Sequence, residues 1–412
     1  MAIHITSNAS QEIIDTQTTD CCIVGGGPAG TLLALLLARQ GIHVILLETH
    51  KDFDRDFRGD TIHPSVMEIM AELDLAESLL QLPHTKMHRM SLGTSEKQAV
   101  IADFSHLKTA YPYITMLPQV KFLEFITTEA KKYPNFQLVM GANVQEILRV
   151  NNTTIGVSYR GQGGWHEVRA KLTVGADGRH SKLRQLGEFE AISTSAPMDV
   201  LWFRLPKHRE EAPGGMGRIG RGHIVAMLDR GEQWQIAYVI PKGTYQKIRH
   251  QGLEILRQSV IEVVPELVDR IAFLHDWSQI AFLSVESDRL KCWYSQGLLL
   301  IGDAAHVMSP IGGVGINYAI QDAVVASNVL SKPLKTGTLN VDDLAQVQRQ
   351  RELPTRVIQT FQSLIQQRIF APALDSQNSQ PFQPPRWLGL PGLRDFPARL
   401  IAFGVFPAHV KM

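Results

Sequence analysis

The chain has 412 residues, and its 41 lysines and arginines against 40 aspartates and glutamates leave a formal net charge of +1. This balance, without any run of basic residues, argues against a nucleic-acid partner. The length and a hydrophobic content of 44% predict a globular protein of two domains with a large core.

The cysteines, Cys21, Cys22 and Cys292, have neither the number nor the spacing of a disulfide framework or a metal site. We therefore expect reduced thiols, no metal and a cytoplasmic location. The longest apolar runs, such as residues 32–38, are too short to span a membrane.

The first 19 residues are polar and lack the basic start and apolar stretch of a secretory signal, so we expect a flexible N-terminal tail. A short apolar strand over 21–24 follows, then an apolar helix over 31–39 and a second strand over 43–48. A turn rich in glycine joins the first strand to the helix.

This turn carries Gly25, Gly27 and Gly30 in the spacing G-x-G-x-x-G, and the second strand ends in Glu48. The strand, turn, helix and strand, with an acid about 20 residues after the glycines, predict a dinucleotide site. The pyrophosphate would lie at the helix N-terminus, where free N–H groups and the helix dipole favour an anion. Glu48 would accept the ribose hydroxyls and repel a 2′-phosphate, which favours FAD or NAD over NADP.

The same letters recur at Gly215, Gly217 and Gly220, but no apolar strand precedes them and no helix follows. We predict a turn in a sheet there. The alternative is that Arg218 and Arg221 contact a phosphate of a transient cofactor.

The next segments alternate between helix and strand patterns. We expect a helix over 64–73, a hairpin over 86–103, a helix over 119–132 and strands over 136–174. Strand-like runs at 199–205, 223–228, 233–240 and 279–288 then predict an antiparallel sheet, with one helical stretch over 245–268. We interpret this sheet as an inserted second domain.

The fully apolar run 297–303 predicts a buried strand of the first domain. Helices are expected over 315–330 and 341–369, followed by a linker over 371–385. Residues 387–410 are apolar but broken by prolines, and predict a surface flap or short helix; peripheral membrane contact is left open for them.

Two further segments place an acid where a strand ends and a helix begins. Asp177 and Gly178 follow one apolar strand, and Asp303 follows another, before a loop rich in proline and glycine that leads to a helix at 315.

With these three motifs in this order and spacing, the chain resembles the class A FAD-dependent monooxygenases, the family of p-hydroxybenzoate hydroxylase and the ubiquinone-biosynthesis hydroxylases. The resemblance covers roughly residues 20–370. It implies an α/β fold: a Rossmann-like FAD-binding domain, an inserted antiparallel-sheet substrate domain and a helical C-terminal region.

The domain boundaries follow from this resemblance. The FAD-binding domain would comprise 20–190 and 291–370, with strands in 86–115 joining the substrate domain. The substrate domain would cover 191–290, and residues 371–412 would form a linker and a C-terminal flap.

The resemblance also implies the cofactor contacts. Glu48 would hold the ribose, Arg58 and Gly59 the ribityl chain or flavin edge, and Gln119 would lie against FAD. Asp177 with Gly178 would act near the phosphates, and Asp303 would bind a ribityl hydroxyl. The residues expected to cradle the pyrophosphate are Gly25, Gly27, Pro28, Ala29 and Gly30. Those expected to line the isoalloxazine ring are Pro310, Gly312, Gly313, Gly315, Ile316 and Asn317.

In this family NADH or NADPH reduces FAD, O2 adds to flavin C4a, and the resulting hydroperoxide attacks an electron-rich aromatic ring. The protein must hold the ring close and exclude water. The helix start near Gly315 would stabilise negative charge on reduced flavin by roughly 0.3–2 kcal/mol. The chain shows no second nucleotide-binding fold, which suits a transient visit of NAD(P)H.

The substrate pocket is expected on the second sheet, from Trp202, Arg204, His223, Met227, Trp234 and Tyr238. Tyr238 and His223 are the candidate catalytic residues, because either could orient or deprotonate a phenol. The apolar surroundings favour a hydrophobic aromatic or polyketide-like substrate. His306 is expected to be structural.

Three other classes of flavoprotein share parts of this pattern. A flavin halogenase needs a W-x-W-x-I-P motif, which residues 234–241 do not match. An FAD-dependent reductase of isoprenoid double bonds shares the glycine and acidic motifs, and a non-catalytic flavin- or ligand-binding protein would share the fold. The sequence leaves open whether the protein is a monomer or a homodimer.

Overall fold

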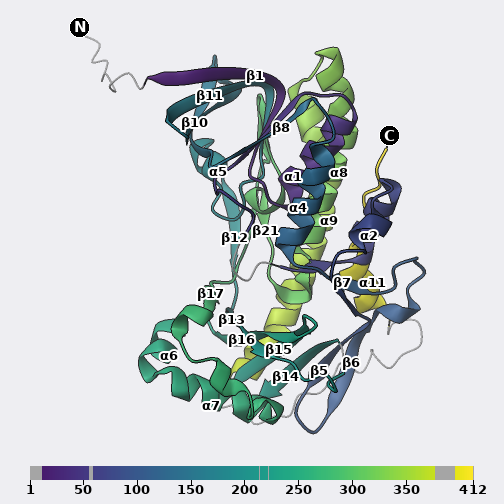
Figure 1. Ribbon diagram of the computed structural model, residues 1–412, viewed down its shortest axis with the longest axis vertical. Helices are drawn as coiled ribbons and strands as arrows, with labels where there is room; N and C mark the ends of the chain where they lie inside the picture. Colours follow the sequence, from purple (N-terminus) through teal and green to yellow (C-terminus); the bar gives the residue numbers. More distant parts are fainter. Residues whose placement is uncertain (1–11, 55–58, 213, 221, 376–394, 412) are drawn as a thin grey trace.

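The computed structural model describes residues 12–54, 59–212, 214–220, 222–375 and 395–411. Its larger sheet lies in the upper half of Figure 1 and has parallel strands at its centre. Its strand order is β19 (Tyr294–Ser295), β20 (Leu298–Leu300), β11 (Gly164–Gly175), β1 (Ile13–Val24), β2 (Val44–Glu48) and β8 (Phe136–Met140). The antiparallel strands β10 (Thr153–Gly161) and β9 (Asn143–Val150) extend from β11.

The strand β1 begins earlier than the sequence suggested. Residues 13–19 pair with β11 in parallel, so the prediction of a flexible tail through residue 19 is wrong for them. The β-branched residues Ile13, Ile14, Thr16, Thr18 and Thr19 suit a strand, although the segment is polar enough to resemble a tail. Residues 1–11 lie outside the described residues.

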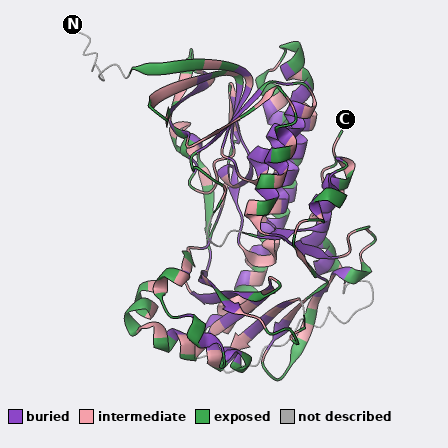
Figure 2. Cartoon of the chain, viewed as in Figure 1, coloured by how far each residue is buried: buried purple, intermediate pink, exposed green. Residues whose placement is uncertain are grey.

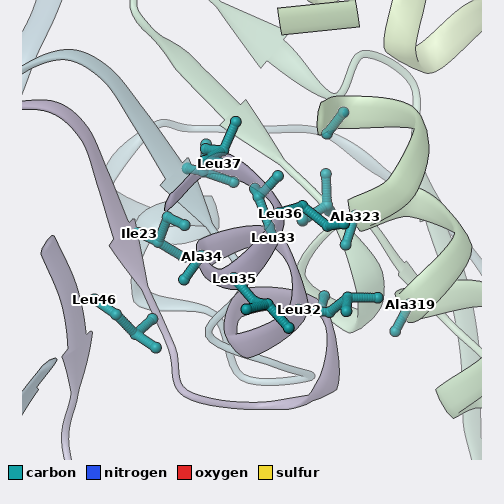
Figure 3. Close-up of a cluster of buried hydrophobic side chains, with 14 of the residues drawn as sticks. Ile23, Leu32, Leu33, Ala34, Leu35, Leu36, Leu37, Leu46, Ala319 and Ala323 are labelled. Carbon is teal, nitrogen blue, oxygen red and sulfur yellow. The ribbon is translucent and has the colours of Figure 1, made fainter. Parts of the chain in front are cut away.

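Helix α1 (Pro28–Arg39) is apolar on all sides, and its residues from Ala29 to Ala38 are buried. It packs beside α4 (Gln119–Ala130) and α8 (Gly315–Thr336). Figure 3 shows Leu32, Leu33 and Leu36 turned toward Ala319 and Ala323 of α8. The glycine turn before α1 is thereby fixed between a rigid strand and a rigid helix.

The second sheet lies at the lower end of the molecule in Figure 1, with α6 (Tyr245–Gln251) to its left and α7 (Leu253–Val263) below it. Figure 2 shows α6 largely exposed. The strand order is β17 (Ala281–Leu283), β13 (Met198–Pro206), β16 (Gln233–Pro241), β15 (His223–Asp229), β14 (Gly215–Gly220), β5 (Arg89–Gly93) and β6 (Gln98–Asp103).

Two predictions for this region need correction. The glycine repeat 215–220 is not a turn but the strand β14, paired with β15 and β5. A Cβ at Gly217 would come 2.6 Å from the Leu92 side chain, so the glycine permits close approach of neighbouring strands. The helical stretch 245–268 is interrupted at Gly252, whose φ of +96° ends α6 and starts α7.

Two small sheets connect the halves. One contains β12 (Ala191–Ser195), β18 (Glu286–Leu290) and β21 (His306–Val307). The other contains β3 (Thr61–Ile62), β7 (Ile114–Met116) and β4 (Thr85–Met87), and lies near α2 (Pro64–Glu72) and α3 (Ala76–Leu79).

The chain ends in helices. After α9 (Val341–Ile365) a π-helical turn, Gln366–Phe370, leads to α10 (Ala371–Leu374), so the predicted linker cannot begin at 371. The rest of that linker, 376–385, lies outside the described residues, as does 387–394 of the predicted flap. The helix α11 (Phe396–Phe403) buries Pro397, Ala398 and Ala402 against the body of the protein. Among the helices that the structure describes, none is both long and apolar enough to cross a membrane.

Candidate cofactor and substrate site

The glycine turn has the geometry that its spacing predicted. Gly25 has a φ of +107°, and a Cβ there would come 2.4 Å from the Ala176 carbonyl oxygen. A Cβ at Gly30 would come 2.0 Å from the Gly25 oxygen, so strand and helix could not approach this closely with any larger residue. By contrast, the Cβ direction of Gly27 is open to 4 Å.

Glu48 is buried at the end of β2 and turns its carboxylate toward this turn. Its Oε2 accepts a hydrogen bond from the Gly26 N–H (2.8 Å), and its Oε1 accepts from both the N–H (2.9 Å) and Nδ1 (2.7 Å) of His50. His50 was not foreseen from the sequence. It lies two residues after Glu48, where it can reach the same carboxylate.

Asp177 and Gly178 follow β11, and the Asp177 Cα lies directly against Gly25, 2.7 Å from where a Cβ would be. The Asp177 carboxylate, however, accepts hydrogen bonds from the Ser181 hydroxyl (2.5 Å) and the Leu183 N–H (3.1 Å), at the start of α5 (Lys182–Leu186). Burial outweighs these bonds and raises the pKa of Asp177 above its ordinary value. The carboxylate therefore organises the start of α5, while Gly178, whose Cβ direction is open, leaves the backbone accessible.

The Gly302–Asp303 segment lies on the same edge of the larger sheet. Ile301 N–H donates to the Gly175 carbonyl (2.9 Å), and a Cβ at Gly302 would be 3.3 Å from the Ala29 Cβ. The carboxyl ends of β1, β2, β11 and β20 thus bring together Gly25–Gly30, Glu48, Asp177 and Gly302–Asp303, which is where α/β sheets bind their ligands.

A buried carboxylate that the sequence reading missed supports this segment. Asp322 of α8 accepts hydrogen bonds at Oδ2 from the Gly302 N–H (3.0 Å) and His306 Nε2 (2.6 Å), and at Oδ1 from Arg351 Nε (2.8 Å). Although burial acts in the opposite direction, His306 and Arg351 lower the pKa of Asp322. His306 is thus buried and bonded to Asp322, which agrees with the structural role expected for it.

The loop of residues 308–314, between β21 and α8, is called the flavin-side loop. It turns through two glycines with left-handed backbone, Gly312 (φ +78°) and Gly313 (φ +65°). Thr61 Oγ1 donates a hydrogen bond to the Gly313 carbonyl oxygen (2.9 Å). Ile316 packs against Gly59, whose Cβ would be 3.4 Å from it. The predicted flavin-side residues therefore lie next to the segment 59–61; Arg58 lies outside the described residues.

Glutamine side chains of α9 and of the π-helical turn after it hold this loop from behind. Gln362 Nε2 donates to the carbonyl oxygens of Ser309 (2.9 Å) and Ile311 (2.8 Å), and Gln366 Nε2 donates to Ser309 Oγ (2.8 Å). Gln359 Nε2 donates to the carbonyl oxygens of Val307 (3.1 Å) and Asp288 (2.7 Å). These three buried glutamines lie on one helix face, and their spacing of three and four residues is the sequence feature from which this could have been predicted.

The geometry fits a bound dinucleotide. In the described chain, neither α1 nor α8 has a side-chain cap or an acidic residue in its first turn, so the leading N–H groups of both helices remain open to an anionic ligand. The open backbone at Gly27 and Gly178 suits a pyrophosphate. Asn317 Oδ1, at the start of α8, is buried and has no hydrogen-bond partner among the described residues.

The two candidate catalytic residues of the second sheet do not lie at this site. Tyr238 is buried on the face packed against α7, and its hydroxyl is bonded to Ser259 Oγ (2.6 Å) and His223 Nδ1 (2.8 Å). Burial raises the pKa of Tyr238 to about 12 and lowers that of His223. Met227 and Trp234 lie on this same face, because strand residues alternate between faces.

The opposite face of the sheet is turned toward the flavin-side loop. Val200, Trp202, Ala237 and Val239 form a cluster there with Ile311 of the loop and with Phe370, Ala373 and Leu374 near α10. A row of aligned residues crosses this face: Trp202, Ala237, Ala226 and Gly217. Three of these four positions carry alanine or glycine, and Ala237 is buried in the cluster described above.

Gln119 and Asp60 connect the two halves at the edge of this face. The Gln119 N–H donates to Asp60 Oδ1 (2.8 Å), and Asp60 Oδ2 pairs with Arg230 Nη2 (2.5 Å) at the end of β15. Neither Asp60 nor Arg230 was selected from the sequence, because no local motif surrounds them.

Comparisons with known proteins agree with this geometry. Residues 18–358 match the family described as FAD binding domain. A 6-methylpretetramide 4-monooxygenase of Streptomyces rimosus is 32% identical over 356 residues, covering 85% of this chain and 84% of that protein. A 12-dehydrotetracycline 5-monooxygenase/anhydrotetracycline 6-monooxygenase of Streptomyces rimosus subsp. rimosus is 25% identical over 318 residues, 74% of this chain; the match spans 61% of that longer protein.

Among solved structures, PqsL of P. aeruginosa in complex with 2-aminobenzoylacetate superimposes with a TM-score of 0.75 at 20% identity. The match covers 88% of this chain and 98% of that one. At this level of identity it supports the arrangement of the two sheets.

Proposed function

The chain belongs to the class A FAD-dependent aromatic monooxygenase family, and from this premise we propose that it uses NAD(P)H and O2 to hydroxylate a hydrophobic, polycyclic aromatic substrate of the polyketide type. The observation that carries the proposal is one continuous arrangement of residues. It runs from Glu48 past the glycine turn and Gly302 to Asn317, and ends opposite the apolar face of the second sheet.

Each part of this arrangement has a proposed role. Gly25–Gly30 and the α1 N-terminus would hold the pyrophosphate, with Glu48 at the ribose and Asp303 at the ribityl chain. Gly59, Gln119, Pro310, Gly312, Gly313 and Gly315–Asn317 would surround the ring system. Bound FAD would supply hydride acceptance from NAD(P)H and the activation of O2.

The protein itself would hold the ring system and the substrate in place and exclude water from between them. The α8 N-terminus favours negative charge on the ring system, by roughly 0.3–2 kcal/mol. Trp202 and Ala226, which are only half-buried, would offer an apolar surface for an aromatic substrate beside the buried Ala237, and the surrounding clusters would exclude water. With Tyr238 and His223 on the other face, we propose no side-chain base from this sheet.

The substrate class is supported by similarity and by surface chemistry. The relative with 32% identity is named for 6-methylpretetramide, and the second relative for tetracycline precursors. The sheet face presents aromatic and small apolar side chains, as a planar polycyclic ring system requires. We propose the same class for this chain, without choosing between NADH and NADPH.

The experiment is to load the protein with FAD and follow NADH or NADPH oxidation and O2 uptake against polycyclic phenols and simple benzoates. The proposal predicts a yellow protein whose NAD(P)H oxidation rises with polycyclic phenols. A protein that cannot be loaded with FAD contradicts the whole assignment. Stimulation by benzoates alone contradicts the substrate class, and substrate turnover without O2 would indicate a reductase.

The cytoplasmic location, the choice between monomer and homodimer, and the domain boundaries remain predictions. The described part of the C-terminal segment buries the apolar face of α11 inside the protein, so that face is not available to a membrane.

A further inference from the structure

A buried amide stands on the sheet face that is turned toward the flavin-side loop. Gln235 of β16 is 3% exposed, and its Oε1 has no hydrogen-bond partner among the described residues. It lies next to Ala237 on the same face, because Trp234 and Ile236 point to the other side. A buried acceptor without a donor is costly, so it indicates a group that the protein alone does not supply.

A buried donor lies close to this acceptor. Arg230 uses Nη2 to pair with Asp60, and its Nη1 is buried without a hydrogen-bond partner in the described part of the chain. The Asp60 carboxylate is already engaged at both oxygens, by Arg230 and by the Gln119 N–H. The charge of Arg230 is therefore compensated, while one of its N–H groups remains unused.

The hairpin register brings the two groups together. Arg230 N–H donates to the Gln233 carbonyl, so Gln235 is the diagonal cross-strand neighbour of Arg230. Side chains in this relation start roughly 7–8 Å apart, within reach of each other when they are long. Arg204, which pairs directly with Gln235 across the sheet, is a third polar residue of this corner.

Titration behaviour agrees with this placement. Burial lowers the pKa of Arg230, Asp60 opposes that shift, and the charge of Arg204 adds to it. Burial raises the pKa of Asp60, although Arg230, Gln119 and Arg204 act in the other direction. Arg230 and Asp60 are therefore partly removed from water, and Arg204 is a second cation close to both of them.

We propose that Arg230 Nη1 and Gln235 Oε1 together anchor a neutral donor–acceptor edge of the aromatic substrate, such as a primary carboxamide or a carbonyl beside a hydroxyl. This rests on the proposed function, because it gives the substrate of that same site a polar end and an orientation. The carbonyl oxygen would accept from Arg230, and the N–H or O–H would donate to Gln235.

A carboxylate of the same shape fits less well. It has no donor for Gln235 Oε1, and the charge of Arg230 is already compensated by Asp60. The site therefore selects the carboxamide over the carboxylate, because the carboxylate leaves the buried Gln235 Oε1 without a donor. Unpaired buried polar groups give stronger selectivity than differences in apolar contact.

The test compares two probes of equal shape, 2-naphthamide and 2-naphthoate, by calorimetry on the FAD-loaded protein. The expected result is that the amide binds roughly tenfold more tightly or better, as one unmatched buried hydrogen bond implies. Binding needs no turnover, so this result is independent of NAD(P)H oxidation and O2 uptake, which report on the proposed function.

Two variants locate the effect. Gln235→Leu removes the acceptor. Arg230→Lys retains a cation for Asp60 but replaces the planar guanidinium by a single nitrogen, so that no second nitrogen stands where Nη1 was. Each variant is expected to abolish most of the preference for the amide. Gln233→Leu, on the same strand and exposed, is the matched control and should preserve it. FAD content and melting temperature verify that each variant is folded.

The inference is overturned if the two probes bind equally, if the naphthoate binds more tightly, or if neither binds to protein that is loaded with FAD. It is also overturned if the preference survives in both variants.

Discussion

At Gly25 the structure has no room for a Cβ atom. The φ of +107° is strained for any other residue, and a Cβ would overlap the Ala176 carbonyl. At Gly27 the backbone has an ordinary φ of −78° and open space in front of it.

These two glycines therefore predict different losses on substitution. Gly25→Ala should lose at least about 1–3 kcal/mol of stability, together with FAD. Gly27→Ala should fold normally but bind FAD more weakly, because its methyl group would point toward the pyrophosphate. Thermal melts and FAD titrations of both variants decide this, and equal melting temperatures would contradict the account.

Asp322 gives a prediction for stability against pH. Its pKa is lower in the folded protein than in the unfolded chain, because His306 and Arg351 outweigh the effect of burial. The stabilisation it provides is therefore complete above the unfolded value, about 3.9, and is lost as the pH falls through the folded value.

The variant Asp322→Asn leaves Arg351 as a buried charge without its anion and should cost about 3–5 kcal/mol at neutral pH. We expect the gap in unfolding free energy between wild type and variant to narrow as the pH drops below roughly 4. Urea titrations over a pH series measure it, and a constant gap would show that Asp322 is not the titrating group.

At the scale of elements, α9 acts on the flavin-side loop through its glutamines. Gln362 alone holds two carbonyl groups of that loop. Gln362→Met should cost about 1–3 kcal/mol and let the loop move, so that more of the O2 consumed leaves as H2O2.

The control for this prediction is Gln367→Met, an exposed glutamine of the following π-helical turn, which should change neither quantity. The measurement is H2O2 formed per NAD(P)H oxidised, together with the melting temperature. An unchanged H2O2 ratio in Gln362→Met would show that the glutamine only stabilises the fold.

Local patterns were sufficient for those elements whose side chains follow a period. The glycine turn, α1, α4 and the hairpin of β5 and β6 lie close to their predicted positions, because each has a complete local signature. The first half of β1 was missed because its partner β11 is distant in the sequence. The strand β14 was missed because its three glycines resemble a turn, although it pairs with both β15 and β5.

The same limit applies to side chains. Asp177 could be selected from its motif, but its carboxylate serves α5, which the motif does not reveal. The face on which Tyr238 lies depends on which side of the sheet α7 covers. Asp60, Arg230, Gln235 and Asp322 gain their significance from partners far away in the chain, which one sequence does not provide.

At the scale of the whole molecule, the second sheet meets the flavin-side loop through two apolar clusters, and α11 closes one of them. Ala398, Leu400 and Ile401 pack with Met308 and Val314 of the loop, and His63 Nδ1 is bonded to the Ile401 carbonyl (2.8 Å). The C-terminus is therefore part of the support of the site.

Deleting residues 395–412 should uncover this cluster, lower the melting temperature and weaken FAD binding. Removal of only Lys411 and Met412, at the very end, is the matched control and should have little effect. A truncated protein with wild-type FAD affinity would show that α11 does not support the loop.

The central claim is that this chain transfers an oxygen atom from O2 to an aromatic substrate. The most direct measurement is mass spectrometry of the product after turnover with NAD(P)H and isotopically labelled O2, using the polycyclic phenol that best stimulates the enzyme. The account predicts one labelled oxygen atom in each hydroxylated product. A hydroxylated product without the label, whose new oxygen therefore comes from water, or a product that forms equally without O2, would contradict it.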